Sequence, residues 1–522
     1  MAIPNVRVNV NEVSLAGQNV NVPFLPAILL KTKSGPIGTV ERINSRAEFI
    51  AKFGQSDSTT AAAYAVEKYL QLYNYAYITR IANTEAAKKG ELSLSFKTDG
   101  NETVDLVSVS TIYNTDLENG KTVKLVVDTE ANKIFLDLSD IMGRNMTTIK
   151  EDISIGTVKA AERDSDGNLT GGLEYILDKL VKSANAITGI PVIFENKFTD
   201  KMDTDTVPSV TQFEEGFTGY IENGNSGNSV DVSTNDVKDL IDLYNYQDYP
   251  IDEMVIPEYN QPDVVNYAVE KAKENFYRVI ARATGKSVKD MITSVQNYVQ
   301  DNRGTLEIYA NDVTFDDFTD ANGDPVICPV SVAVLNAYAN ANLNQNVWCA
   351  IAGVKRGVLT QVTGLAMKMT RSEMDELYEN IVPINTINYI SSIGYVVWGN
   401  KTSALEADTK IFDRVNVARL INYMTRELTA AGWEFLFEPI TLTLFTEFKA
   451  RLENICQIIA DQDGIDDYAV VCNSSNNTEE SIARNELHAE IQVKPTESLE
   501  YVIINLTGTD TITLNVDETE EV

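Results

Sequence analysis

The chain has 522 residues, of which 43% are hydrophobic, enough apolar material for several folded cores. Its 76 acidic and 43 basic side chains give a formal net charge of -33, so phosphate backbones and anionic lipid surfaces would repel it. Nucleic acid and membrane surfaces are therefore poor candidate partners. The chain starts without a basic segment followed by an apolar one, and no run of 18 apolar residues occurs. We expect neither a secretion signal nor insertion into a membrane.

The first 22 residues predict an extended arm, because Val6, Val8 and Val10 alternate with polar residues in the period of a half-buried strand. A folded core is expected to start over residues 23–85. Its predicted elements, in chain order, are a buried strand at 26–31, a short helix capped by Ser45, a longer helix at 60–73 and a strand at 77–81.

Residues 86–225 have a different texture. Short apolar runs alternate with clusters of Asn, Asp, Gly and Thr, which is typical of a β-rich domain. One helix is expected near 172–183, and the loop at 222–229 is the candidate boundary. This range therefore predicts an inserted domain.

Residues 226–345 predict an α/β domain. Helices alternate with strands there, and this alternation favours an open α/β sheet. The clearest elements are a helix at 263–275, a strand at 276–281, a helix at 287–300 and a strand at 305–309.

Residues 346–507 predict a C-terminal core with a mixed sheet. Two amphipathic helices are expected in it, at 414–428 and 444–459. A second arm at 508–522 follows, in which Ile512, Leu514 and Val516 alternate with polar residues. The predicted fold class is therefore a multidomain chain, α/β and α+β, with extended terminal arms.

Residue types that build metal sites and catalytic triads are scarce. There is one histidine, His488, and the four cysteines (Cys328, Cys349, Cys456 and Cys472) form no CxxC pair. The pattern predicts buried thiols in a reducing compartment and excludes most zinc sites. It also excludes every histidine-centred triad except one built on His488. We expect no metal and no cofactor.

Three short motifs resemble parts of known phosphate-binding or calcium-binding loops, but each lacks a residue that the loop requires. The stretch 283–287 (ATGKS) resembles the end of a phosphate-binding loop, but Ile280 stands where that loop needs glycine. Ser287 as a helix cap is the better interpretation. The Asp-rich stretches 461–467 and 164–168 lack ligand or glycine positions of a calcium loop and predict turns. With no nucleophile signature either, we expect no enzyme.

The segment 346–437 carries six short motifs in a fixed order. They are Trp348, Ala352-Gly353, Ile384-Asn385, Trp398 to Thr402, Val415 to Arg419, and Phe437-Glu438-Pro439. In this order they resemble the C-terminal domain of contractile phage tail sheath proteins. The resemblance covers about 25–85 and 325–506. Residues 329–331 and the pair Ala418-Arg419 depart from the family pattern, which indicates a divergent member.

The resemblance implies a structural subunit that stacks in rings around an inner tube and contracts to drive that tube through a cell envelope. The implied partners are other copies of the chain, the inner tube protein, and baseplate and tail terminator proteins. The implied location is a virion tail assembled in the host cytoplasm. The alternative is a non-contractile tube or a surface-layer protein.

Three expectations concern assembly. The strands of Val6, Val8 and Val10 and of Ile512, Leu514 and Val516 are expected to add to sheets of neighbouring subunits, because a lone terminal strand is unstable in water. Lys449 and Arg451 are candidate contacts to the inner tube, against the alternative of a solvated helix face with i,i+4 pairing. The insert 86–225 lies outside the resemblance and is expected on the outer surface.

Overall fold

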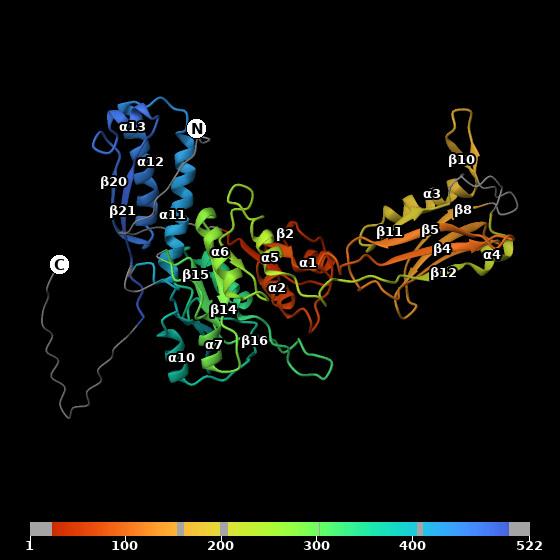
Figure 1. Ribbon diagram of the computed structural model, residues 1–522, viewed down its shortest axis with the longest axis horizontal. Helices are drawn as coiled ribbons and strands as arrows, with labels where there is room; N and C mark the ends of the chain where they lie inside the picture. The colour runs from red at the N-terminus through yellow and green to blue at the C-terminus, as the bar shows by residue number, and fades with distance from the viewer. Residues whose placement is uncertain (1–22, 154–160, 199–206, 302, 405–410, 501–522) are drawn as a thin grey trace. The chain divides into compact units, whose positions relative to one another are not determined.

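The computed structural model describes residues 23–153, 161–198, 207–301, 303–404 and 411–500 (Figure 1). Both predicted arms, 1–22 and 508–522, lie outside these residues. The chain divides into two compact units between Phe437 and Glu438. This division falls inside the range 346–507, which the sequence indicates as one core, so the predicted domain boundaries stay predictions.

A six-stranded sheet forms the centre of the first unit and bears out the expected open α/β sheet. All neighbouring strands are parallel except the edge pair β3–β2. The order is β15 (Leu306–Tyr309), β14 (Arg278–Arg282), β13 (Glu253–Val255), β1 (Pro26–Leu30), β3 (Ala76–Arg80) and β2 (Val40–Ile43). Two ranges that the sequence indicates as separate parts, 23–85 and 226–345, thus share one sheet through the β1–β13 pair.

Helices cover both faces of this sheet, so its strands are apolar on both sides. Ile28 and Leu30 pack into one core, whereas Ala27 and Leu29 pack into the other. The first core holds α1 (Arg46–Phe53), α2 (Ala61–Leu72), α8 (Val330–Ala333) and α9 (Leu335–Asn344). The second holds α5 (Thr234–Ile241), α6 (Pro262–Asn275) and α7 (Val288–Val295).

Two predicted helix caps are present. The Ser45 side chain accepts a hydrogen bond from the Glu48 backbone N–H at the start of α1. Ser287 does the same for Asp290 at the start of α7, so the ATGKS stretch is a strand-to-helix turn with a capping serine, as predicted.

The inserted segment has its own hydrophobic core between two antiparallel sheets (Figure 1, orange to yellow). One sheet has the order β11 (Val192–Asn196), β5 (Thr103–Thr111), β4 (Glu91–Lys97); the other has β12 (Phe217–Tyr220), β6 (Thr122–Asp128), β7 (Lys133–Ser139), β8 (Asn145–Asp152). The predicted helix is α3 (Gly172–Asn185). The sequence analysis missed α4 (Val210–Glu215) and the small pair β9 (Glu162–Arg163) and β10 (Leu169–Gly171). The β9–β10 connection is the predicted turn at 164–168, in which Asp164 accepts from two backbone N–H groups.

The first unit also contains β16 (Val313–Thr314), β17 (Gly364–Leu365), α10 (Arg371–Tyr378), β18 (Thr386–Ile390), β19 (Gly394–Trp398) and α11 (Val415–Glu434). The second unit contains α12 (Leu442–Ala460), the antiparallel pair β20 (Ile465–Val471) and β21 (Glu490–Pro495), and the short α13 (Glu479–Ala483). None of the helices within the described ranges is long and apolar enough to cross a membrane.

Candidate functional site

Three neighbouring strands of the central sheet each place one charged side chain in the protein interior. These residues are Glu253 on β13, Arg278 on β14 and Glu307 on β15, and they are 1%, 2% and 0% exposed. Glu253 and Arg278 are directly paired across the sheet. Because side chains alternate between faces, all three point to the face that also carries Val255, Ile280 and Tyr309 in the first core.

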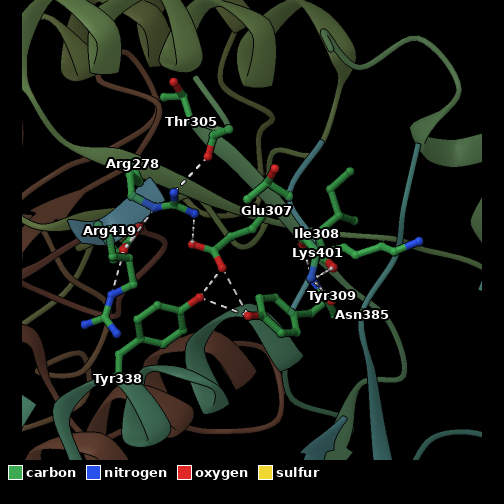
Figure 2. A network of polar contacts seen from close by, with 12 residues as sticks. Arg278, Thr305, Glu307, Ile308, Tyr309, Tyr338, Asn385, Lys401 and Arg419 are labelled. Atoms are coloured by element: carbon green, nitrogen blue, oxygen red, sulfur yellow. Dashed lines mark hydrogen bonds and ion pairs between the residues drawn. The ribbon is translucent and has the colours of Figure 1, made fainter. Parts of the chain in front are cut away.

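Arg278 and Glu307 are the centre of a polar network (Figure 2). Arg278 Nη2 donates to Glu307 Oε1 at 2.7 Å, and its Nη1 donates to the Gly304 carbonyl at 2.8 Å. The other carboxylate oxygen of Glu307 accepts from Tyr309 at 3.1 Å and from the Tyr338 hydroxyl. Glu307 therefore has a charged partner and two hydroxyl donors although water does not reach it.

Helix α11 joins the network through Arg419. Its Nη2 donates to Asn342 Oδ1 on α9, and its Nε lies 3.8 Å from Glu253 Oε1. The guanidinium also stacks over the Tyr338 ring at 4.8 Å from the ring centre. One buried arginine thus attaches α11 both to the sheet and to α9.

The electrostatic setting keeps the tyrosines protonated. Burial, assisted by the charge of Glu307, raises the pKa values of Tyr309 and Tyr338 well above the usual range, so both remain donors. Burial and Glu307 also raise the pKa of Glu253, although Arg278 and Arg419 oppose the shift. Burial by itself would lower the pKa of Arg278, but the carboxylates of Glu307 and Glu253 raise it.

Several sequence motifs of the C-terminal region lie beside the edge strand β15. Asn385, with 0% exposure, donates through Nδ2 to the carbonyls of Ile308 (3.2 Å) and Lys401 (2.8 Å) and accepts from the Lys401 N–H at 3.0 Å. Gly399 precedes this turn with φ +146°, and a Cβ there would meet Asn385 Oδ1 at 2.5 Å, so the close approach needs glycine. Asn385 therefore fastens the turn after β19 to β15 (Figure 2).

The following residues attach the start of α11. Asn400 Nδ2 donates to Asn416 Oδ1 at 2.8 Å, and Thr402 Oγ1 donates to the Phe412 carbonyl at 2.6 Å. The Ser403 N–H donates to the Leu306 carbonyl at 2.8 Å. The motif residues thus form hydrogen bonds that connect the sheet, the turn after β19 and the start of α11.

A small cavity beside the network, which we call the polar cavity, has a volume of about 20 Å³. It is lined by Asp252, Glu253, Arg278, Val347, Arg419, Asn422, Tyr423 and Arg426. A space of this size holds about one water molecule and no organic substrate.

The described residues contain no group of three or more His, Cys, Asp or Glu side chains placed to hold a metal ion. The four cysteines are free; Cys328, Cys456 and Cys472 are buried, as predicted, and Cys349 is partly exposed. Burial raises the pKa of the Cys328 and Cys456 thiols to about 12, which makes them poor nucleophiles.

The candidate tube contacts lie on α12. Lys449 Nζ forms an i,i+4 ion pair with Glu453 Oε1 at 3.3 Å, and both side chains are about 40% exposed. This is the pairing that the alternative interpretation expected. Arg451 lies on the same helix and is half-buried. On the opposite side Leu444, Leu452, Ile455, Cys456 and Ile459 are buried as predicted, but Phe445 is buried instead of the half-buried Phe448.

The six candidate arm residues, Val6, Val8, Val10, Ile512, Leu514 and Val516, lie outside the described residues. The sequence analysis missed Glu253, Arg278, Glu307 and Tyr338. A signal was present, because FYRVIA and TLEIY each place a charge inside a buried strand, where a charge needs a partner.

Comparisons with known proteins agree with the motifs. Residues 407–509 match the family model for the phage tail sheath C-terminal domain. The tail sheath protein of Vibrio phage KVP40 is 34% identical over 164 residues, which is 31% of this chain and 24% of that protein. The tail sheath protein of Enterobacteria phage T4 is 28% identical over 224 residues, which is 42% of this chain and 33% of that protein. The chain therefore matches no more than about a third of the length of either relative.

Likeness in fold extends further along the chain. The sheath tail protein of Desulfitobacterium hafniense has a TM-score of 0.58 at 12% identity, covering 90% of this chain and 94% of that one. The sheath of an extracellular contractile injection system in its contracted state has a TM-score of 0.53 at 14% identity, covering 98% of both chains. The resemblance to contractile tail sheath proteins that the sequence motifs indicated is thereby confirmed, in sequence for the C-terminal part and in fold for nearly the whole chain.

Proposed function

We propose that this chain is the structural subunit of a contractile tail sheath. The match of residues 407–509 to the sheath C-terminal domain is the observation that supports this most directly. In this proposal the chain polymerises as stacked rings around an inner tube and contracts to drive the tube through a cell envelope. Its partners are further copies of itself, the tube protein, and baseplate and terminator proteins of a virion tail that assembles in the host cytoplasm.

The buried network supports a role in transmitting force rather than in catalysis. Arg278, Glu307 and Arg419 tie the sheet to α9 and α11 by directional contacts, and the polar cavity beside them is too small for a substrate. A subunit that transmits force benefits from such fixed joints between its elements. We therefore expect no turnover of substrates.

The contacts between subunits are part of the proposal. The arms that carry Val6, Val8, Val10 and Ile512, Leu514, Val516 add strands to neighbouring subunits. Removal of residues 1–20 or of 508–522 should leave a folded monomer that no longer forms tubes. Normal assembly of either truncated chain would show that the arm is not a link.

Lys449 and Arg451 are the proposed contacts to the inner tube. Both basic side chains lie on one helix of a chain whose net charge is -33. The double change Lys449→Glu, Arg451→Glu should abolish assembly on the tube at moderate salt and leave the fold intact. Unchanged assembly would favour the i,i+4 pairing with Glu453 as the whole role of Lys449.

Electron microscopy of the purified chain, alone and with its tube protein, tests the function. A sheath gives hollow tubes of stacked rings that enclose the inner tube and shorten when triggered. A non-contractile tube keeps one length, and a surface-layer protein gives flat lattices. Either of the last two outcomes would replace the proposed function.

A further inference from the structure

Three residues that line the polar cavity each carry one buried polar atom that no described residue hydrogen-bonds. These atoms are Glu253 Oε2, Arg278 Nε and Arg419 Nη1, and their side chains are at most 3% exposed. Arg278 Nε lies 3.4 Å from Glu253 Oε1, close enough for an ion pair but without a hydrogen bond. Buried polar atoms of folded proteins normally have a partner, so these three atoms together indicate an occupant.

The donors and acceptors define the occupant. The unpartnered atoms are two arginine nitrogens, whose N–H groups can donate, and one carboxylate oxygen, which can accept. A water molecule accepts two hydrogen bonds and donates to a third atom, which is the usual number of contacts for a buried water. The volume of about 20 Å³ suits a single water molecule.

The charges point to a neutral occupant. Arg278, Arg419 and Arg426 supply three positive charges around the cavity. Asp252, Glu253 and Glu307 supply three negative ones, with Arg426 Nη1 2.7 Å from Asp252 Oδ1 and Arg278 Nη2 2.7 Å from Glu307 Oε1. Each of the three arginines already has a carboxylate as an ion-pair partner, so an anion in the cavity would compete with these carboxylates in a buried site.

We propose that the polar cavity is a binding site for one structural water molecule, which accepts from Arg278 Nε and Arg419 Nη1 and donates to Glu253 Oε2. The water completes the joint between α11 and the sheet, because Arg419 belongs to α11 and the other two residues to β14 and β13. A hydrogen bond from water to Glu253 also favours the ionised form of that carboxylate. The inference rests on this geometry and is independent of the proposed function.

An experimental structure of the full chain, at a resolution that reveals ordered water, tests the site. We expect one peak about 2.7–3.2 Å from all three atoms. A cavity closed by direct contacts between the three side chains would overturn the proposal. So would an anomalous bromide peak at this position in protein prepared in sodium bromide, because it would identify an anion site.

A substitution at the cavity wall gives an independent test in solution. Val347 lines the cavity and is 7% exposed, so Val347→Ile should displace the water and lower the urea midpoint of unfolding. Val362→Ile is the matched control, because Val362 has the same exposure and lies in the apolar first core. A midpoint for Val347→Ile above that of the control would mean that the substitution fills an empty space, and the proposal would be wrong. If Val347→Ile does not fold, the presence or absence of the water peak in the wild-type structure decides whether the proposal is right.

Discussion

Arg278 Nη2 lies 2.7 Å from Glu307 Oε1 inside the central sheet, and the two side chains are 2% and 0% exposed. Removing both groups from water costs solvation energy, which the pair offsets only when each partner and its hydrogen bonds are in place. Tyr309 and Tyr338 donate to the other carboxylate oxygen of Glu307. Loss of both partners should therefore lower the free energy of unfolding by less than the two single losses added together.

The first prediction concerns this pair. Arg278→Met should lower the free energy of unfolding by about 3–5 kcal/mol, because Glu307 and Glu253 lose their shared cation. The double change Arg278→Met, Glu307→Gln should lose less than the sum of the two single changes. Urea unfolding followed by far-ultraviolet circular dichroism measures these energies.

Surface arginine Arg484, paired with Glu480 and Glu486 near the end of α13, supplies the control. Its side chain is 51% exposed, so Arg484→Met should leave the unfolding midpoint almost unchanged. Strictly additive losses for Arg278 and Glu307 would contradict the prediction, since independent sites add and coupled sites do not.

Asn385 carries the second prediction. Its side chain makes three hydrogen bonds, to Ile308 and twice to Lys401, from a fully buried position. Asn385→Ala should therefore lower the free energy of unfolding by about 2–4 kcal/mol and loosen the turn before α11. Chemical denaturation gives the energy, and hydrogen exchange of the Lys401 amide reports the turn.

Asn388→Ala on β18, the strand that begins directly after Asn385, is the matched control for that change. Asn388 is half-buried, and none of the hydrogen bonds described for this chain uses its side chain. Equal losses of unfolding free energy for the two variants would mean that any alanine in this region destabilises the fold. The role assigned to the Asn385 hydrogen bonds would then be wrong.

The local sequence pattern predicted many of the helices and strands of this fold. It did not predict which segments that are distant in the sequence pair with one another. The apolar face Val417, Leu420, Ile421, Met424 and Leu428 of α11 is buried as its period indicated. The register of β1 against β13 was not predictable, because parallel strands are paired by contacts between distant segments. The network was missed for the same reason: TLEIY shows a buried charge at Glu307, but its partner Tyr338 comes from a different element. The missed helix α4 had a readable signal, the capping box of Ser209 and Gln212.

Glu258 gives the third prediction, a pH dependence of stability. It follows β13, and its Oε2 is buried without a hydrogen-bond partner. Burial raises its pKa from 4.5 to about 7, although Arg282 and Lys31 oppose the shift. The pKa of Glu258 is higher in the folded protein than in the unfolded chain, so protonation of Glu258 stabilises the fold. This contribution to the free energy of unfolding is complete below pH 4.5 and is lost as the pH rises to about 7.

Between these pH values the free energy of unfolding of the wild-type protein should fall, and the fall should be smaller in Glu258→Gln by up to about 3 kcal/mol. Glu253 and Asp312 also have raised pKa values, but they act equally in both proteins and cancel in the difference. The exposed Glu270→Gln makes the same charge change on the surface of α6. If both variants shift the pH profile alike, net charge is the cause and the role assigned to Glu258 is wrong.

The fourth prediction concerns removal of the insert. Lys88 and Asn225 exchange two backbone hydrogen bonds of 2.9 Å, so the two ends of the insert lie side by side. Its core is made of residues from Leu94 to Ile221 only. A chain that lacks 89–224, closed by a short Gly-Ser link, should therefore fold, and we expect it to assemble as the full chain does. Circular dichroism, size exclusion and electron microscopy measure this.

The hydrogen bonds of Arg80 determine how far the deletion can extend without loss of stability. This arginine is 0% exposed and donates to three carbonyls, those of Gly35 (2.6 Å), Ser226 (2.6 Å) and Asn114 (2.9 Å). Removing 89–224 takes away only Asn114, and water can replace that acceptor once the insert is gone. A longer deletion that includes Ser226 removes two acceptors and should unfold at a clearly lower urea concentration. If both deletions are equally stable, Arg80 does not hold the base of the insert; if the shorter deletion folds but forms no tubes, the insert is required for assembly.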